Sequence, residues 1–250
     1  MTTMMDRMAL EELTRRHLDL YASPDIEAKL KAIVRPGPHS NFSLEELLAI
    51  LCRSRSVFFE THVETVSGHH TATYLRFESI ARFQDLIAPI ARDMADWIDR
   101  TFHDRPLAGI VATTSAAQTL AQAVAEQIGA RMPLRVVLTP YNSETGRIGT
   151  DIAGGTIHAG ERFLSLNDVT TRGQCVRKLG NVITDHGGIL AGMTVFARRD
   201  SGQFPLMDEL MSTYPFYYTV DLSMPQWEPM DCPLCRQDGP MLSWREMPAL

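Results

Sequence analysis

Apolar residues in the first part of the chain recur at the three- and four-residue spacing of helices. Residues 8–22 (MALEELTRRHLDLYA) show this spacing, and residues 23–34 resume it after Ser23, with Pro24 in the first turn. Ser43 and Glu46 have the spacing of a capping box that begins a further helix. These features predict an N-terminal helical extension over residues 1–55.

Beyond residue 55, short apolar runs alternate with helical patterns. Strand composition surrounds a turn at Ser67 and Gly68, and a helix kinked at Pro89 is expected over residues 80–102. The remaining expected elements are strands at 107–115, 133–140, 162–168 and 189–199, helices at 116–128 and 173–188, and a long Gly- and Ser-containing loop at 141–160. Strands that alternate with helices predict the α/β class, with a central, mostly parallel sheet and flanking helices.

The chain changes character after residue 200, where it becomes rich in proline and aromatic residues and contains a C-x-x-C sequence. We therefore expect three units. Residues 1–55 form the helical extension, residues 56–200 the α/β domain, and residues 201–250 a C-terminal tail.

Charge and hydropathy exclude two broad classes. A net charge of −6 argues against a general nucleic-acid surface, which normally carries a basic patch for the phosphates. The first residues mix acids and arginines where a signal peptide needs an apolar run, and no apolar stretch approaches the ~20 residues that span a bilayer. We expect a cytoplasmic protein with reduced cysteines that binds neither nucleic acid nor membrane.

The stretch FLSLNDVTTRGQC, residues 163–175, carries the main chemical signal. It places Asp168 at the end of an apolar strand and two threonines just before an expected helix start. A helix N-terminus holds an anion, hydroxyls of Thr170 and Thr171 add donors, and Gly173 permits close approach of the backbone. Asp168 suits sugar hydroxyls or a nearby divalent cation. A phosphate-binding loop beside a carboxylate that suits sugar hydroxyls indicates a site for ribose 5-phosphate. The simpler interpretation is a strand-to-helix turn in which Asp168 and Thr170 only cap the helix.

This stretch resembles the phosphoribosyl pyrophosphate (PRPP) loop of type I phosphoribosyltransferases. LAGIVATTSAAQTLAQAVAEQIG resembles the family's strand, pyrophosphate loop and helix, and VSGHHTATYL resembles the hood segment of orotate phosphoribosyltransferases. NVITDHGGILAGMTVFARR matches the helix and strand that follow the PRPP loop. The similarity covers roughly residues 55 to 200, in the family's order.

The resemblance implies a type I phosphoribosyltransferase fold with an N-terminal helical or hood extension, and an enzyme that uses Mg²⁺ and PRPP. A nitrogenous base would attack C1 while pyrophosphate leaves. Asp168, Asn167 and Arg147 would serve catalysis, and a loop near residues 140–157 would close over the site. The implied ligand contacts are Thr170, Thr171, Arg172, Gly173 and Gln174 for the 5-phosphate, Thr113, Thr114, Ser115 and Ala116 for pyrophosphate, and Ser67, Gly68, His69 and His70 in the hood.

Members of the family usually form homodimers, and the apolar residues at 57–59 and 216–218 are candidate contact surfaces.

The departures from the family pattern concern the charges. Asn167 replaces the first acid of the usual pair, Arg172 stands where glycine is common, and His69 occupies the hood lysine position. No lysine occurs between residues 32 and 177.

Because arginine and lysine are not equivalent at such sites, we expect an acceptor other than orotate. A PRPP-binding regulator of the same fold is the alternative, and a nucleotide pyrophosphorylase, which runs the same chemistry in reverse, is a third.

Cys232 and Cys235 form a second signal. Their spacing, with a proline between them, is typical of the knuckle of a structural zinc site. His69 and His70 are the expected further ligands; Cys52, His158, His186 or a partner subunit are alternatives. The simpler interpretation is two reduced thiols in a folded tail.

Overall fold

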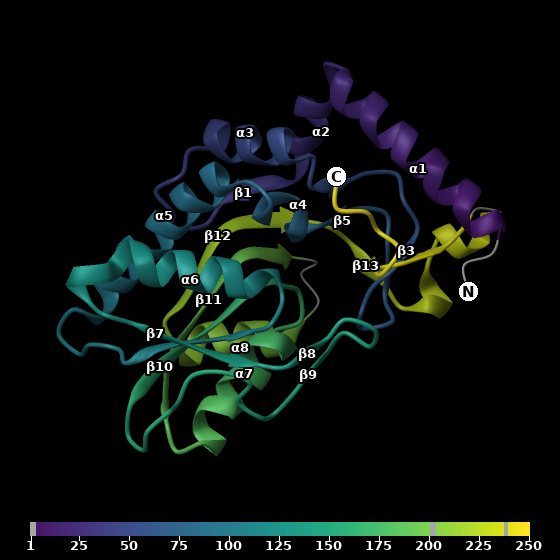
Figure 1. Cartoon of the computed structure of the whole chain (residues 1–250). Coiled ribbons are helices and arrows are strands. Elements are labelled where there is room, and N and C mark those ends of the chain that lie inside the picture. Colours follow the sequence, from purple (N-terminus) through teal and green to yellow (C-terminus); the bar gives the residue numbers. More distant parts are fainter. Residues whose placement is uncertain (1–3, 201–203, 238–239) are drawn as a thin grey trace.

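The computed structural model describes residues 4–200, 204–237 and 240–250 (Figure 1). The helices are α1 (Met4–Ala22), α2 (Asp25–Ile33), α3 (Leu44–Ser54), α4 (Phe77–Ala81), α5 (Gln84–Phe102), α6 (Ala116–Ile128), α7 (Gln174–Asp185) and α8 (Pro205–Thr213), with 3₁₀ turns at Gly129–Arg131, Pro229–Asp231 and Leu234–Arg236. The strands are β1 (Val34–Pro36), β2 (Val57–Phe58), β3 (Val63–Glu64), β4 (His70–Thr71), β5 (Tyr74–Leu75), β6 (Gly109–Thr113), β7 (Arg135–Thr139), β8 (Tyr141–Asn142), β9 (Arg147–Ile148), β10 (Arg162–Thr170), β11 (Ile189–Asp200), β12 (Phe216–Ser223), β13 (Gln226–Trp227) and β14 (Leu242–Ser243).

The central sheet has six strands in the order β1-β12-β11-β10-β6-β7. All neighbouring strands in it run parallel except β1, which is antiparallel to β12. The parallel strands follow the order of a doubly wound sheet whose winding direction changes between β6 and β10. In such sheets ligands bind outside the carboxyl ends of the two strands at this switch point. The predicted α/β class is confirmed.

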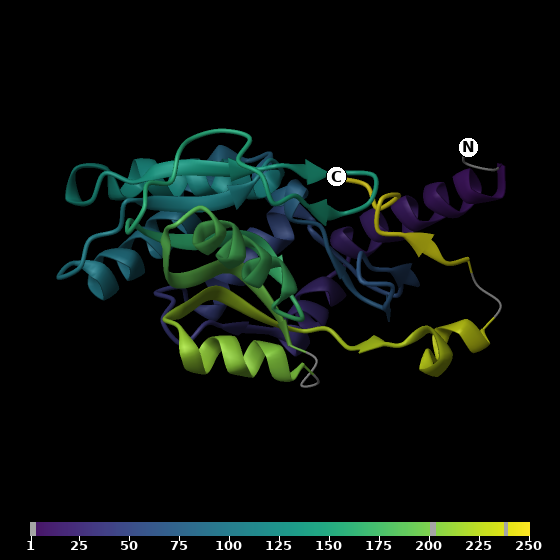
Figure 2. The ribbon, with the colours of Figure 1, turned by 90° about the horizontal axis from the view of Figure 1, so that it is seen from below.

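Apolar side chains cover both faces of the sheet because successive strand residues point to opposite sides. In β10, Leu164 and Leu166 join the larger core, with α2 to α6, while Phe163 points to the face covered by α7. Helix α8 adds a smaller cluster beside α7, built around Met207 and Leu210. Figure 2 shows these helix layers on either side of the sheet.

Two local predictions have different outcomes. The capping box is confirmed, since Ser43 caps the amide of Glu46 and the Glu46 carboxylate accepts from the Ser43 amide. The single helix expected over residues 80–102 is wrong at its start. Phe83 takes an extended conformation (φ −110°, ψ 104°) that separates α4 from α5, and Pro89 lies within α5.

A second, smaller sheet joins the hood to the tail. Its order is β13-β4-β3-β14, so two strands of the tail flank the hood hairpin. Leu13 of α1 packs in the same cluster as Val63 and Leu242. The flanking segments also contribute β1 and β12 to the central sheet (Figure 1). The division into units at residues 55 and 200 stays a prediction.

The surfaces proposed for dimer contact are wrong. Val57, Phe58 and Tyr217 are fully buried within this chain, and Phe216 and Tyr218 are nearly so. They form the interior because β2 and β12 pack under helices. Homodimer formation itself stays a prediction. Within the described residues, no helix combines the length and apolar character needed to cross a bilayer.

Candidate active site

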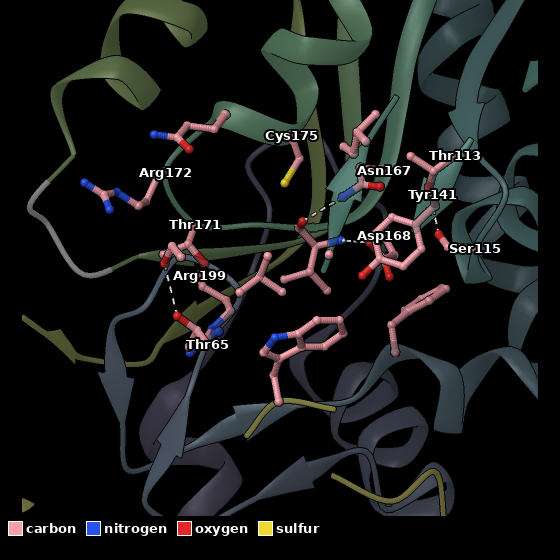
Figure 3. Close-up of a pocket in the computed structure, with 18 of the residues that line it drawn as sticks. Thr65, Thr113, Ser115, Tyr141, Asn167, Asp168, Thr171, Arg172, Cys175 and Arg199 are labelled. Carbon is pink, nitrogen blue, oxygen red and sulfur yellow. Dashed lines mark hydrogen bonds between the residues drawn. The ribbon is translucent and has the colours of Figure 1, made fainter. Parts of the chain in front are cut away.

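A cavity of about 480 Å³ opens at the switch point of the sheet. Its floor consists of the carboxyl ends of β6 and β10, with Thr113 on one side and Asp168 on the other. The hood, the β8–β9 hairpin and the tail supply the walls through residues such as Ser67, Arg147 and Trp244. Figure 3 shows side chains that line the cavity, with Thr113, Tyr141 and Asp168 among those labelled.

The loop from β10 to α7 lies at one end of the cavity. Thr171, Arg172 and Gln174 line it. Thr170 does not; it is buried, and its Oγ1 accepts a hydrogen bond of 3.2 Å from the Gly173 amide. Gly173 has φ +76°, and a Cβ there would lie 2.8 Å from Leu210 Cδ1. Thr170 and Gly173 therefore shape the loop, whereas Thr171, Arg172 and Gln174 face the cavity.

Asp168 and Asn167 both border the cavity at the end of β10. The Asp168 carboxylate accepts a 2.8 Å hydrogen bond from the Val169 amide. Burial, with the nearby Glu78 carboxylate, raises the pKa of Asp168 to about 7. Asn167 Nδ2 donates to the Val169 carbonyl at 3.0 Å. Asp168 is therefore poised to lose a proton when a ligand supplies donors or positive charge.

The segment after β6 lies at the other end of the cavity. Thr113 and Ser115 line it, with their hydroxyls 2.7 Å apart, and Ser115 caps the Ala117 amide of α6. Thr114 and Ala116 are not among the lining residues. Thr114 Oγ1 instead accepts from the Tyr141 amide at 3.0 Å, which ties this segment to the β8–β9 hairpin.

The hairpin β8–β9, within the loop predicted to close over the site, already lies against the hood and the tail. Gly146 has φ +68°, and a Cβ there would be 2.5 Å from Val66 Cγ1 and 3.2 Å from Trp244 Cζ2. Arg147 lines the cavity beside it. Tyr141 faces the same space, and burial together with Asp168 raises the pKa of its hydroxyl to about 12.

The hood contributes Ser67 to the lining, while Gly68, His69 and His70 lie outside it. Gly68 (φ +79°) forms the turn between β3 and β4. The His69 Nε2 lies 2.7 Å from the Glu228 carboxylate, and Arg172 Nη1 lies 3.3 Å from the same ring. His69 thus connects the tail to the phosphate-side loop.

The predicted metal set is wrong in one member. His62, rather than His69, lies with His70, Cys232 and Cys235. His69 directly precedes His70, the first residue of β4, and adjacent residues of extended backbone point to opposite sides. His62 precedes β3 across the hairpin and reaches the side of His70. The sequence analysis overlooked His62.

The sequence analysis also overlooked Arg199, which is only 5% exposed and lines the cavity. Its Nη2 donates to the Thr73 carbonyl at 3.3 Å, and the Gln226 amide oxygen, turned towards it, accepts from both Nη atoms at 3.1 and 3.2 Å. In the described part of the chain its Nε has no hydrogen-bond partner and no carboxylate pairs with it. Burial lowers its pKa to about 10.

The arginine pair at the end of an apolar strand was the available signal for Arg199. Adjacent strand residues face opposite sides of the sheet, so the two side chains had to meet different surroundings. Arg198 pairs with Asp221 at 2.6 Å, and Arg199 faces the cavity.

Cations outnumber carboxylates among the lining residues. The cations are Arg76, Arg147, Arg172, Lys178 and Arg199, and the carboxylates are Glu78 and Asp168. Glu78 also forms a 3.3 Å ion pair with Arg76. The cavity therefore favours a ligand with several negative charges.

Known proteins resemble this chain over most of its length, although no family model matches it. An orotate phosphoribosyltransferase of Thermus thermophilus is 29% identical over 192 residues, which are 76% of this chain and 96% of the relative. That of Caldicellulosiruptor saccharolyticus is 24% identical over 190 residues, covering 76% and 91%.

Solved structures show the same fold. The UMP synthase of Leishmania donovani gives a TM-score of 0.54 at 18% identity, over 70% of this chain and 36% of that one. The orotate phosphoribosyltransferase of Aeropyrum pernix gives 0.50 at 13% identity, over 69% and 90%. The resemblance to type I phosphoribosyltransferases of the orotate phosphoribosyltransferase kind is confirmed, as is the fold class.

Proposed function

We propose that this chain is a phosphoribosyltransferase that transfers phosphoribose from PRPP to a ring nitrogen of a base and releases pyrophosphate. The main support for the proposal is the set of side chains that line one cavity. A helix N-terminus with Thr171 and Arg172, a carboxylate at Asp168, and the hydroxyl pair of Thr113 and Ser115 all border it. The curated relatives that bear the name orotate phosphoribosyltransferase support the same reaction class.

Each part of PRPP has a corresponding part of the cavity. The 5-phosphate would bind at the start of α7, where Thr171, Gln174 and the Arg172 guanidinium provide donors beside the helix dipole. The ribose hydroxyls would donate to Asp168. Pyrophosphate would lie between the Thr113–Ser115 end and Arg147 of the hairpin.

The donor set at the centre suits a hydrated magnesium ion. Asp168 and Asn167 present hard oxygen atoms, and magnesium usually keeps several waters while it binds one or two carboxylates and phosphate oxygens. When bound, Mg²⁺ would neutralise part of the pyrophosphate charge. The single acid at this position, in place of a pair, leaves more of that neutralisation to the surrounding arginines.

The reaction needs no covalent nucleophile from the protein. The C1–oxygen bond to pyrophosphate breaks as the C1–nitrogen bond to the base forms, and positive charge develops at the ribose. A carboxylate at Asp168 would stabilise this charge, and Arg147 would stabilise the charge that collects on pyrophosphate. Contact of the hairpin with Val66 and Trp244 would exclude water from the cavity while the positive charge is on the ribose.

The acceptor would bind on the side of the hood and the tail. Arg199 and Gln226 lie there, together with Trp244. The Arg199 guanidinium lines the cavity and suits a carbonyl oxygen or an anionic substituent of the base. Because Lys178 is the one lysine that lines the cavity in the described part of the chain, we propose that the preferred acceptor is a heterocycle other than orotate.

A PRPP-binding regulatory protein is the second candidate. Asn167 in place of an acid and the small number of lysines favour binding without turnover. The two functions differ in one measurement, which is pyrophosphate release in the presence of a suitable acceptor.

The decisive experiment incubates the protein with PRPP, Mg²⁺ and a panel of purine, pyrimidine and smaller heterocyclic bases, orotate included. Pyrophosphate release that depends on both Mg²⁺ and one base supports the enzyme. PRPP binding by calorimetry without release for any base supports the regulator. Absence of PRPP binding overturns both, and efficient formation of orotidine 5-phosphate overturns the acceptor assignment alone.

A further inference from the structure

Four side chains from two distant parts of the chain converge beside the hood. His62 and His70 come from the β3–β4 hairpin, and Cys232 and Cys235 from the tail. One nitrogen or sulfur atom of each lies within 4.8 Å of all the others. The set is separate from the cavity described above, because none of the four residues lines it.

Four of the six distances between these atoms are close to the edges of a tetrahedral zinc site, and the other two are within 4.8 Å. His62 Nε2 lies 3.2 Å from His70 Nδ1, 3.7 Å from Cys232 Sγ and 3.5 Å from Cys235 Sγ, and His70 Nδ1 lies 3.1 Å from Cys235 Sγ. Zinc–ligand bonds of about 2.3 Å to sulfur and about 2.0 Å to nitrogen place tetrahedral nitrogen pairs about 3.3 Å apart and nitrogen–sulfur pairs about 3.5 Å apart.

Hydrogen bonds alone do not account for this arrangement. His62 Nε2 faces His70 Nδ1 and both sulfur atoms at once, and an imidazole nitrogen carries either one proton or one lone pair. It can therefore form a well-directed hydrogen bond with only one of these three neighbours. A cation that accepts a lone pair from each of the four atoms satisfies all of them together.

We propose that His62, His70, Cys232 and Cys235 bind one structural zinc ion. Two thiolates with two imidazoles in tetrahedral positions are typical of zinc rather than of magnesium or calcium, which prefer oxygen ligands. Four protein ligands leave no open position for a substrate, so the ion would serve structure. The Cys-Pro-Leu-Cys turn supplies the short knuckle, in which Cys232 is buried and Cys235 is exposed.

The position of the site indicates what the ion would hold in place. Trp227 of β13 pairs with His70, and Leu242 of β14 pairs with Val63, so the tail is attached to the hood on both sides of the knuckle. Zinc would fix the segment between these two strands. In the described residues the backbone of that segment forms 3₁₀ turns and no longer element of its own.

The site would also fix the orientation of the hood towards the phosphate-side loop. His70 is a ligand, and its neighbour His69 contacts both Glu228 of the tail and Arg172. This consequence for ligand binding rests on the proposed function, whereas the presence of zinc does not.

The test begins with the metal content of the wild-type protein, prepared without a histidine tag and without added metal, in the presence of a reductant. Elemental analysis should find about one zinc per chain. Extended X-ray absorption should show two sulfur and two nitrogen neighbours, and replacement by Co²⁺ should give the intense visible absorption of a thiolate-bound tetrahedral site.

Matched variants separate this ligand set from its neighbours. His62→Gln and Cys235→Ser should lower the zinc content to a small fraction of one per chain, whereas His69→Gln and Cys52→Ser should keep it. If a ligand variant does not fold, a chelator titration of the wild-type protein supplies the same information: removal of zinc should make the chain near residues 228–237 sensitive to protease.

Three results would overturn the proposal. These are wild-type protein without zinc whose two tail thiols react freely with an alkylating agent, a disulfide between Cys232 and Cys235, and zinc that persists in His62→Gln but is lost in His69→Gln. None of these readouts involves PRPP, so they stand apart from the test of the proposed function.

Discussion

Arg172 Nη1 lies 3.3 Å from both ring nitrogens of His69, and the Arg172 guanidinium lies 5.0 Å from the centroid of the Phe204 ring. The side chain that would meet a phosphate is thus held between the hood and the start of α8. Since His69 Nε2 faces the Glu228 carboxylate, this contact extends from the phosphate-side loop into the tail.

The first prediction concerns this arginine. Arg172→Gln removes the cation beside the α7 N-terminus, and a charge-assisted hydrogen bond of this kind is worth about 1.5–3 kcal/mol. PRPP affinity measured by calorimetry should therefore fall by about tenfold or more. Arg177→Gln is the matched control, since Arg177 is exposed on the same helix and does not line the cavity. Equal affinities for the two variants would contradict the assignment of the phosphate site.

The second prediction concerns the pH dependence of ligand binding. The pKa of Asp168 is raised to about 7, so part of the ligand-free protein holds the neutral acid at neutral pH. The groups that act on this carboxyl are Glu78, Arg76, Tyr141 and Cys175. The carboxylate accepts hydrogen bonds from ribose hydroxyls more strongly than the neutral acid does, so PRPP affinity should rise from pH 6 to 8 and then level off.

Asp168→Asn provides the reference for this measurement. Ionisation of the ligand's own phosphate near pH 6 affects both proteins equally, and the difference between the two profiles isolates Asp168. A wild-type profile parallel to that of the variant between pH 6 and 8 would show that Asp168 does not contact the sugar.

The third prediction concerns the acceptor side. Arg199→Lys keeps the positive charge but loses the planar set of donors that faces the cavity and Gln226. The KM for the acceptor base should rise by about tenfold, while the Kd of PRPP stays within about twofold, because our proposal assigns Arg199 to the acceptor and assigns Arg172 and the α7 N-terminus to the phosphate. Steady-state kinetics together with calorimetry test this. A larger change in PRPP affinity than in the KM for the acceptor would contradict the assignment of Arg199 to the acceptor base.

The fourth prediction concerns stability. His17 is buried, stacks on Phe58 at 3.9 Å, and its Nε2 lies 2.9 Å from the Arg55 carbonyl oxygen. Burial lowers its pKa to about 4. Between about pH 6.5 and pH 4 the unfolded chain therefore binds the additional proton, and the free energy of unfolding should decrease as the pH falls, by about 3 kcal/mol in total.

Denaturant titrations at a series of pH values measure this change. His17→Gln keeps a donor for the carbonyl but does not titrate, so its stability should vary less over the same range. If the wild-type and variant curves stay parallel from pH 6.5 to 4, His17 is not the group responsible.

Between residues 107 and 199 the sequence predicted the strand-and-helix order well because apolar runs and caps are local signals, but α8 and β12 in the predicted tail were missed. The capping box at Ser43 and the start of α7 after Gly173 needed nothing beyond neighbouring residues. The resemblance to a known family pointed to the end of β10, and Asn167 and Asp168 there line the cavity.

Contacts between distant segments were the part that the sequence could not supply. The zinc-like cluster depends on the pairing of β13 with β4, which decides that His62 rather than His69 meets the cysteines. Likewise only the folded chain places Gln226 of the tail against Arg199. Thr170 was predicted to touch the phosphate, yet its hydroxyl is used within the loop itself.

The antiparallel pairing of β1 with β12 has a consequence for the order of folding. Val34 pairs with Leu222 and Pro36 with Val220, so a strand made early in synthesis finds its partner only after the whole α/β core has left the ribosome. Pairings so distant along the chain form late because a very long loop must close first. Refolding should therefore end in a slow step in which β1, with α2 and α3 packed on it, docks onto a sheet that is already assembled.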